Sequence, residues 1–192
     1  MDFTDTWKAY DLSEDVNLKK YIEDALSGKL PKKSFYKINE IIPQRLAKDI
    51  ERLIGFSVKD FGNEISPNHI KHINDRHGES GKADHSMKDI SNFARIGYII
   101  ENYDRVIKGD INREYRNKDG SPSHNIVLQK KIADNYYYVV EAVPDANKKI
   151  LHVVSAHINK NDTFPVVDNA ISPTPDVPNE PQSNVSFDNI VS

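Results

Sequence analysis

The sequence predicts an α+β domain in which N-terminal helices pack on a C-terminal antiparallel β-meander of three to four strands. Up to about residue 102, apolar residues recur at helical spacing between helix start and stop signals. After Asn102 the apolar residues alternate instead, in runs rich in Val, Ile and Tyr. Runs of helices followed by runs of strands are typical of this class, with helices covering one face of the sheet.

Helices are expected in the first half of the chain, each with a capping residue before it. The predicted helices span residues 13–26, 43–54 and 67–77, followed by a helix that starts at residues 86–89 and carries apolar residues as far as Ile100. Glycine follows each of the first three, which is the usual end of a helix. Pro43 and Pro67 stand at the first helical position, where proline is favoured.

The predicted strands span residues 104–116, 125–133, 136–143 and 150–158. Asp134-Asn135 and the segment 144–147 are suitable hairpin connections between the last three. Residues 166–192 are predicted to be a disordered tail or linker, because from Ser172 onward four prolines and three acids stand without a base. The chain ends without a stop signal for structure, so we expect it to be part of a longer polypeptide.

Composition excludes several classes of function. The net charge of −3 belongs to the tail, and the rest of the chain is neutral. The sequence has no cysteine, so a disulfide, a thiolate nucleophile and a Cys-based metal site are excluded. It has no apolar run long enough to span a membrane and no signal-peptide pattern in its first thirty residues.

The densest group of chemically active residues is the histidine-rich helix 67–77. Ile70 and Ile73 define its buried stripe, and His69, His72 and Arg76 share an adjacent flank. His77 stands last before Gly78, where the helix end favours a charged imidazole. A solvated flank with His77 as a capping residue is the structural alternative. A phosphate-handling site fits better than a metal site, because the pair His69 and His72 lacks a well-placed acidic third ligand.

The last strand adds a second group. Alternation places Ser155 and His157 together on one of its faces. On the same reasoning Lys130 shares a face with Ile126, Leu128 and Ile132, while Lys131 points the other way. Glu141 shares a face of its strand with Tyr137 and Val139. Taken singly, Lys130 and Glu141 are typical surface residues, but together with Ser155 and His157 they are candidates to converge on the histidine-rich helix.

The segment 105–131 carries seven bases against three acids. This local charge of +4 is a modest indication of nucleic-acid binding. The segment includes Arg113, Arg116 and Tyr115, and Tyr115 is a candidate base-stacking residue. A solvated basic loop is the alternative.

The order of these motifs resembles the phage-associated members of the barnase–EndoU–colicin–RelE-like nuclease superfamily. The resemblance covers residues 38–160. It rests on the helix 43–54 ending at Gly55, the His-rich helix, the Ile-Ile-Glu-Asn-Tyr-Asp-Arg-Val segment at 99–106, a Lys-bearing strand, a Tyr-Tyr-Val-Val strand and the final Leu-His-Val-Val-Ser-Ala. It implies a nuclease domain at 38–165, after an N-terminal helical extension at 1–37 and before the tail at 166–192.

The resemblance implies a metal-independent ribonuclease toxin, often one that cleaves tRNA. Matched residue by residue, it assigns catalytic roles to His72, His77, Lys130 and Ser155. Arg76, His157, Lys131, Arg113 and Arg116 are the expected substrate-binding residues. The strand lysine falls on Lys130 or Lys131, and His157 stands where relatives more often carry an aromatic residue.

RNA supplies its own nucleophile, the 2′-OH, so such an enzyme needs a base, an acid and cations for the phosphorane. The hypothesis makes His72 the base and His77 the acid, or the reverse, with a 2′,3′-cyclic phosphate and a 5′-hydroxyl as products. No metal and no cofactor are expected. The alternatives are a non-catalytic module that binds nucleic acid or protein, and a structural phage segment.

The resemblance also implies where the protein acts. It is expected to be phage- or prophage-encoded and to act in the bacterial cytoplasm, after delivery with a virion or a secretion system. The expected partners are RNA and a cognate immunity protein. Contact with a membrane is not expected, and the isolated domain is expected to be a monomer.

Overall fold

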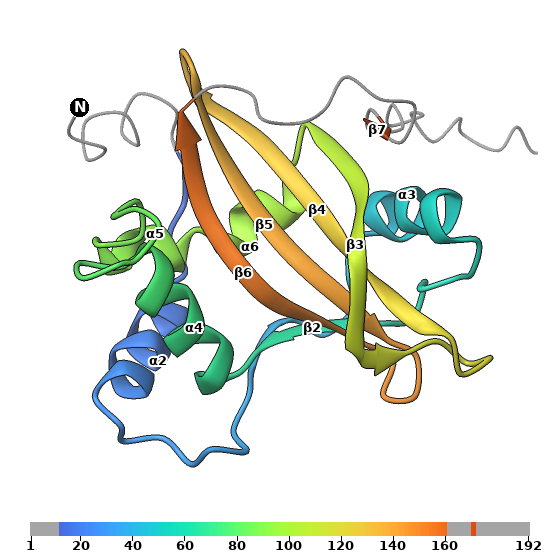
Figure 1. Cartoon of the computed structure of the whole chain (residues 1–192), viewed down its shortest axis with the longest axis horizontal. Helices are drawn as coiled ribbons and strands as arrows, with labels where there is room; N and C mark the ends of the chain where they lie inside the picture. The colour runs from blue at the N-terminus through green and yellow to red at the C-terminus, as the bar shows by residue number, and fades with distance from the viewer. Residues whose placement is uncertain (1–11, 161–169, 172–192) are drawn as a thin grey trace, which may run out of the picture.

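The computed structural model describes residues 12–160 and 170–171 (Figure 1). The helices are α2 (Val16–Leu26), α3 (Gln44–Ile54), α4 (Pro67–His77), α5 (Ile90–Ala94) and α6 (Ile96–Glu101). The strands are β1 (Tyr36–Asn39), β2 (Gly62–Ile65), β3 (Arg105–Arg116), β4 (Pro122–Ala133), β5 (Tyr136–Asp145), β6 (Ile150–Lys160) and β7 (Ala170–Ile171). Helices thus dominate the N-terminal half and strands the C-terminal half, which confirms the α+β class.

All described strands join one sheet in the order β1-β2-β6-β5-β4-β3-β7. Strands β3 to β6 form the predicted antiparallel meander and make up most of it. The sequence did not predict β1 and β2, which are four residues each, too short to show alternation. β2 pairs parallel with β6 and all four of its residues are buried. This short strand leads directly into α4, so it fixes where the histidine-rich helix starts.

The first three predicted helices form nearly as expected. α3 ends at Gly55, whose φ of 81° is the left-handed conformation that glycine adopts without strain. The fourth is wrong as a single helix, because the chain forms the two short helices α5 and α6 with Arg95 between them. The helical segment begins after Asp89, whose side chain caps α5, and not at Ser86. None of the helices in the described ranges has the length and apolarity to cross a membrane.

α2 joins the same core as the rest of the domain. Its side chains Leu18 and Ile22 are fully buried within the core cluster. Figure 1 places α2 beside α4 and α5, at one edge of the meander. The predicted extension at 1–37 is therefore packed on the domain from Val16 onward, and its first eleven residues lie outside the described part.

The predicted tail at 166–192 also lies outside the described residues, apart from β7. Those two residues pair antiparallel with Val106 and Ile107 of β3. Ala170 and Ile171 are therefore part of the sheet rather than of a disordered tail.

Ser86 connects the segment before α5 to the sheet. Its buried hydroxyl accepts a hydrogen bond of 3.0 Å from the backbone N–H of Ile158 in β6. We expect Ser86→Ala to lower the free energy of unfolding by about 1–3 kcal/mol, because the buried N–H loses its acceptor. Chemical denaturation measures this, with the exposed Ser57→Ala as control. Equal stability of the two variants would contradict a stabilising hydrogen bond between Ser86 and Ile158.

Candidate active site

A polar cavity of about 600 Å³ lies between α4 and the neighbouring face of the sheet. Residues from α4, the following loop and strands β3 to β6 line it: His69, His72, Arg76, His77, Ala83, Asp84, Asn112, Glu114, Asn125, Glu141, Val154, Ser155, His157 and Asn159. Seven of the residues singled out from the sequence are among them, namely His69, His72, Arg76, His77, Glu141, Ser155 and His157. The structure therefore brings the two sequence-predicted groups together in one site.

β6 presents its polar side chains to the cavity through alternation and a bulge. Glu141 pairs with Ser155 while the next residue, Ala142, pairs with Val153, so Val154 is an extra residue on β6. Beyond this bulge, Ala156 and Ile158 are buried in the core, and Ser155 and His157 take the opposite face.

α4 presents the second group because its apolar stripe faces inward. Ile70 and Ile73 are fully buried, whereas His72 and Arg76 are exposed on the flank beside the cavity. The helix starts at Ser66, whose hydroxyl accepts a hydrogen bond from the backbone N–H of His69. Neither His72 nor Arg76 has a side-chain hydrogen bond or ion pair with another described residue, so both remain available to a ligand.

His77 is held from both sides at the end of α4. Its backbone oxygen accepts from Met87, and its ring Nδ1 lies 2.8 Å from a carboxylate oxygen of Asp84. Burial alone would raise the pKa of Asp84, but hydrogen bonds from Ser86 and His77 outweigh it and lower that pKa. The ionised carboxylate can only accept, so His77 donates through Nδ1, which leaves Nε2 of the neutral ring without a hydrogen.

His157 stacks on His77 within the cavity. The two rings are 4.8 Å apart between centroids and nearly parallel, at 14°. Burial, with the charge of the neighbouring His77, lowers the pKa of His157 to about 4. Burial lowers the pKa of His69 to about 4 as well. At neutral pH both imidazoles are uncharged. The His157 ring that stacks on His77 therefore adds no positive charge beside the contact between His77 and Asp84.

Glu141 lines the cavity, although the sequence gave it no catalytic or substrate-binding role. Asn125 donates to its carboxylate over 3.1 Å, and Asn112 in turn donates to Asn125. Burial raises the pKa of Glu141 despite the hydrogen bond from Asn125. Alternation grouped Glu141 with Tyr137 and Val139, and the register against Ser155 brings Glu141 into the cavity.

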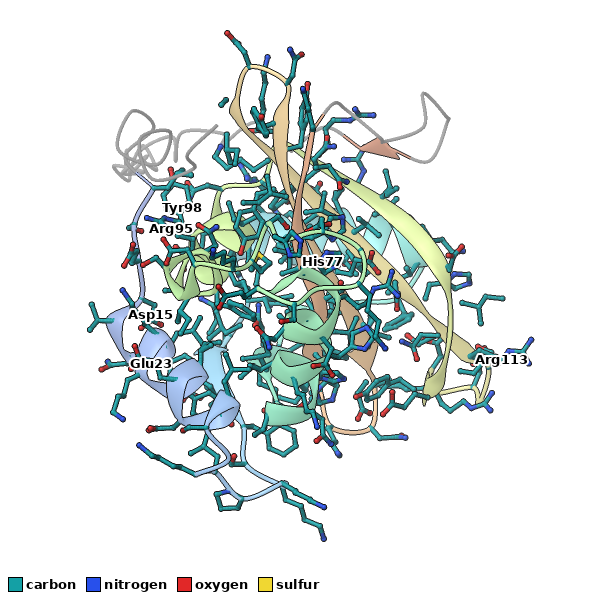
Figure 2. All side chains as sticks on the ribbon, turned by 60° about the vertical axis from the view of Figure 1, so that its left-hand side comes forward. Asp15, Glu23, His77, Arg95, Tyr98 and Arg113 are labelled. Atoms are coloured by element: carbon teal, nitrogen blue, oxygen red, sulfur yellow. The ribbon has the colours of Figure 1, made fainter. Side chains whose placement is uncertain are left out.

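The remaining basic residues singled out from the sequence do not line this cavity. Lys130 alternates in phase with the buried Leu128, so it leaves the sheet on the core side, where its Nζ lies 3.3 Å from Asp104. Lys131 lies 4.0 Å from Asp134 beside the hairpin. Figure 2 shows Arg113 at the edge of the molecule, pointing away from His77. Arg116 ends β3 and is exposed.

The loop that carries Asp84 depends on Gly81. A Cβ atom at this position would collide with the backbone oxygens of Asp84 and Arg76. We therefore expect Gly81→Ala to displace the loop, to destabilise the protein by about 1–3 kcal/mol and to reduce the activity of the site. Lys82→Ala, an exposed change in the same loop, is the matched control. Thermal unfolding checks this, and wild-type stability of Gly81→Ala would contradict the described loop.

The depressed pKa values of His69 and His157 predict a pH dependence of stability. Unfolding returns each pKa from about 4 to about 6.5, so between these values the unfolded chain binds protons that the folded chain does not. The free energy of unfolding should therefore fall as the pH is lowered from 6.5 to 4. Denaturation at several pH values should give a shallower slope for His157→Gln. A slope equal to that of the wild type would contradict this burial of His157.

Among residues 12–160 and 170–171, no group of three His, Asp or Glu side chains is arranged to hold a metal ion. What the cavity does gather is imidazole, guanidinium, carboxyl and hydroxyl groups, the equipment for proton transfer and for binding an anion. A helical layer packed on an antiparallel sheet, with such a site between them, defines the class of small α+β nucleases that the sequence resembles.

Comparison with known families agrees with that class. The chain belongs to the family described as phage-Barnase-EndoU-ColicinE5/D-RelE like nuclease3, whose model matches residues 40–164. Searches of curated proteins and of solved structures gave no match. Membership makes the domain a nuclease of a phage-associated family, and the matched range includes every residue that lines the cavity.

Proposed function

We propose that this domain is a ribonuclease that cleaves RNA by attack of the 2′-OH on the adjacent phosphate. The observation that carries the proposal is the gathering of His72, Arg76 and His77 from α4 with Glu141 and Ser155 from the sheet around one cavity. RNA brings its own nucleophile, so a base, an acid and a cation are sufficient. The cavity offers a residue for each role, and none of the steps requires a metal.

His77 is the proposed acid. Asp84 holds its Nδ1, which leaves Nε2 to protonate the 5′-oxygen as that oxygen leaves the phosphorus. The proposed base is His72, which is exposed at the cavity, or Glu141, which lies on the sheet opposite Ser155. Burial raises the pKa of Glu141 and so makes its carboxylate a stronger base than a solvated one.

Arg76 is the proposed cation for the phosphorane. It lines the cavity one residue before His77, and its planar guanidinium suits two oxygens of one phosphate. Ser155 lines the same cavity, and its proposed role is to donate a hydrogen bond to the same group. Lys130, to which the resemblance gave the role of strand lysine, is left out of this proposal because it pairs with Asp104 outside the cavity.

The wider setting is a proposal that the phage-associated family supports. We propose that the domain acts as a phage- or prophage-encoded toxin in the bacterial cytoplasm, with tRNA as one candidate substrate. A cell that produces it would need a cognate immunity protein, for which the cavity is the natural surface to block.

The chemistry of the cut ends tests the proposal. Purified protein should cleave an RNA oligonucleotide to fragments with 2′,3′-cyclic phosphate and 5′-hydroxyl ends, and should leave the 2′-O-methyl oligonucleotide of the same sequence intact. Cleavage of the 2′-O-methyl strand, or fragments with 5′-phosphate ends, would contradict attack by the 2′-OH.

A further inference from the structure

The end of β3 leaves the sheet beside the cavity. Asn112 pairs with Ser123 and Arg116 with Pro122, so three residues of β3 have no counterpart on β4. In Figure 1 this end of β3 lies across the neighbouring strands rather than alongside them. Glu114, in the middle of the segment, lines the cavity. Glu114 therefore contributes to one wall of the site, and Arg113 and Tyr115 lie on either side of it in the chain.

Tyr115, the residue after Glu114, is held in place by a buried histidine. Its ring stacks on His152 of β6, with centroids 4.8 Å apart and 26° between the planes. His152 is 2% exposed and lies between two buried carboxylates, 3.5 Å from Glu64 and 3.5 Å from Asp145. A ring supported in this way is held in one orientation before any ligand binds, and that lowers the entropy cost of stacking on it.

The side chain of Tyr115 is nevertheless open to a ligand. It is only half-buried, and its hydroxyl has no hydrogen-bond partner among the described residues. Arg113 and Arg116 flank it, both exposed and without an ion pair in the described part of the chain. An anchored aromatic ring beside unpaired arginines, at the wall of a cavity, is the combination with which proteins bind single-stranded nucleic acid.

We propose that Tyr115 is a platform on which one unpaired nucleobase stacks, next to the nucleotide that is cleaved. The inference rests on the proposed ribonuclease function and narrows its substrate class. A base can stack on a side chain only when it is splayed out of a helix, so the substrate is single-stranded or looped RNA rather than a continuous duplex. Arg113 and Arg116 then contact the phosphates on either side of the stacked base.

Binding of a non-cleavable RNA tests the platform directly. The probe is a fluorescent single-stranded 2′-O-methyl oligonucleotide, and a series of it carries one abasic nucleotide at each position in turn. Tyr115→Leu should bind the intact oligonucleotide about tenfold more weakly than the wild type, because base–aromatic stacking is lost. Tyr115→Phe and Tyr115→Trp should bind as the wild type does. At one abasic position the wild type and Tyr115→Leu should bind equally.

The series separates stacking from a structural role. If Tyr115→Leu weakens binding by the same factor at every abasic position, or if Tyr115→Phe is as weak as Tyr115→Leu, the platform is overturned. Equal affinity of wild type and Tyr115→Leu for the intact strand overturns it as well. Cleavage of unmodified RNA by the wild type is followed in parallel, so failure of the proposed function appears as intact RNA, independently of these affinities.

Discussion

Replacing His77 by alanine is expected to lower kcat/KM for RNA cleavage by about 10²–10⁴-fold, the usual contribution of a positioned acid or base. The expectation rests on two contacts of the His77 ring, with Asp84 and with His157. A backbone hydrogen bond from Met87 also holds the residue in place. His124→Ala is the matched control, because that histidine lies on β4 outside the cavity. Steady-state kinetics on a defined oligonucleotide measures the effect.

The fold of the variant is checked by thermal unfolding, so that a loss of activity is read as loss of chemistry. Asp84→Asn provides a second measurement, since it keeps the shape of the side chain but removes the charge that fixes the His77 tautomer. This variant should lower kcat and move the alkaline limb of the pH profile, which reports the general acid. Wild-type kinetics for a folded His77→Ala would remove His77 from the proposal.

The second large effect is expected at Arg76. Removing a preorganised donor to a developing oxyanion costs about 10²–10³-fold in kcat, and we expect Arg76→Ala to fall in that range. Arg76→Lys should recover part of the loss, because lysine keeps the charge but not the planar pair of donors. Lys71→Ala is the control, an exposed base on the same helix that does not line the cavity. A change in KM alone would show that Arg76 contributes only to substrate binding.

The positions of α4 and β6 could be predicted because local signals specify them. Ser66, Pro67 and Gly78 mark the ends of α4, and the isoleucine stripe decides which flank faces the cavity. Alternation along β6 likewise put Ser155 and His157 together on one face, and the bulge at Val154 turns that face away from the core residues Leu151 and Val153. Capping and periodicity are short-range rules, and they were sufficient to bring seven cavity residues forward from the sequence.

What the sequence missed depends on contacts between distant segments. Asp84 lies in a loop, and only the tertiary contact with His77 distinguishes it from any exposed acid. Glu141 enters the cavity through its register with Ser155, and Tyr115 reaches His152 through an irregularity of β3 that no periodicity predicts. The position of Lys130, in contrast, could be predicted from its strand alone. Alternation had already grouped Lys130 with the core-facing residues of its strand, and the structure agrees with that grouping.

The most direct test of the account is cleavage of total tRNA by the purified domain in excess EDTA, with His77→Ala beside it. The account predicts discrete fragments with cyclic-phosphate ends from the wild type, and intact tRNA with the variant. Cleavage that EDTA abolishes, or equal fragments from both proteins, would contradict a metal-independent nuclease whose chemistry depends on His77.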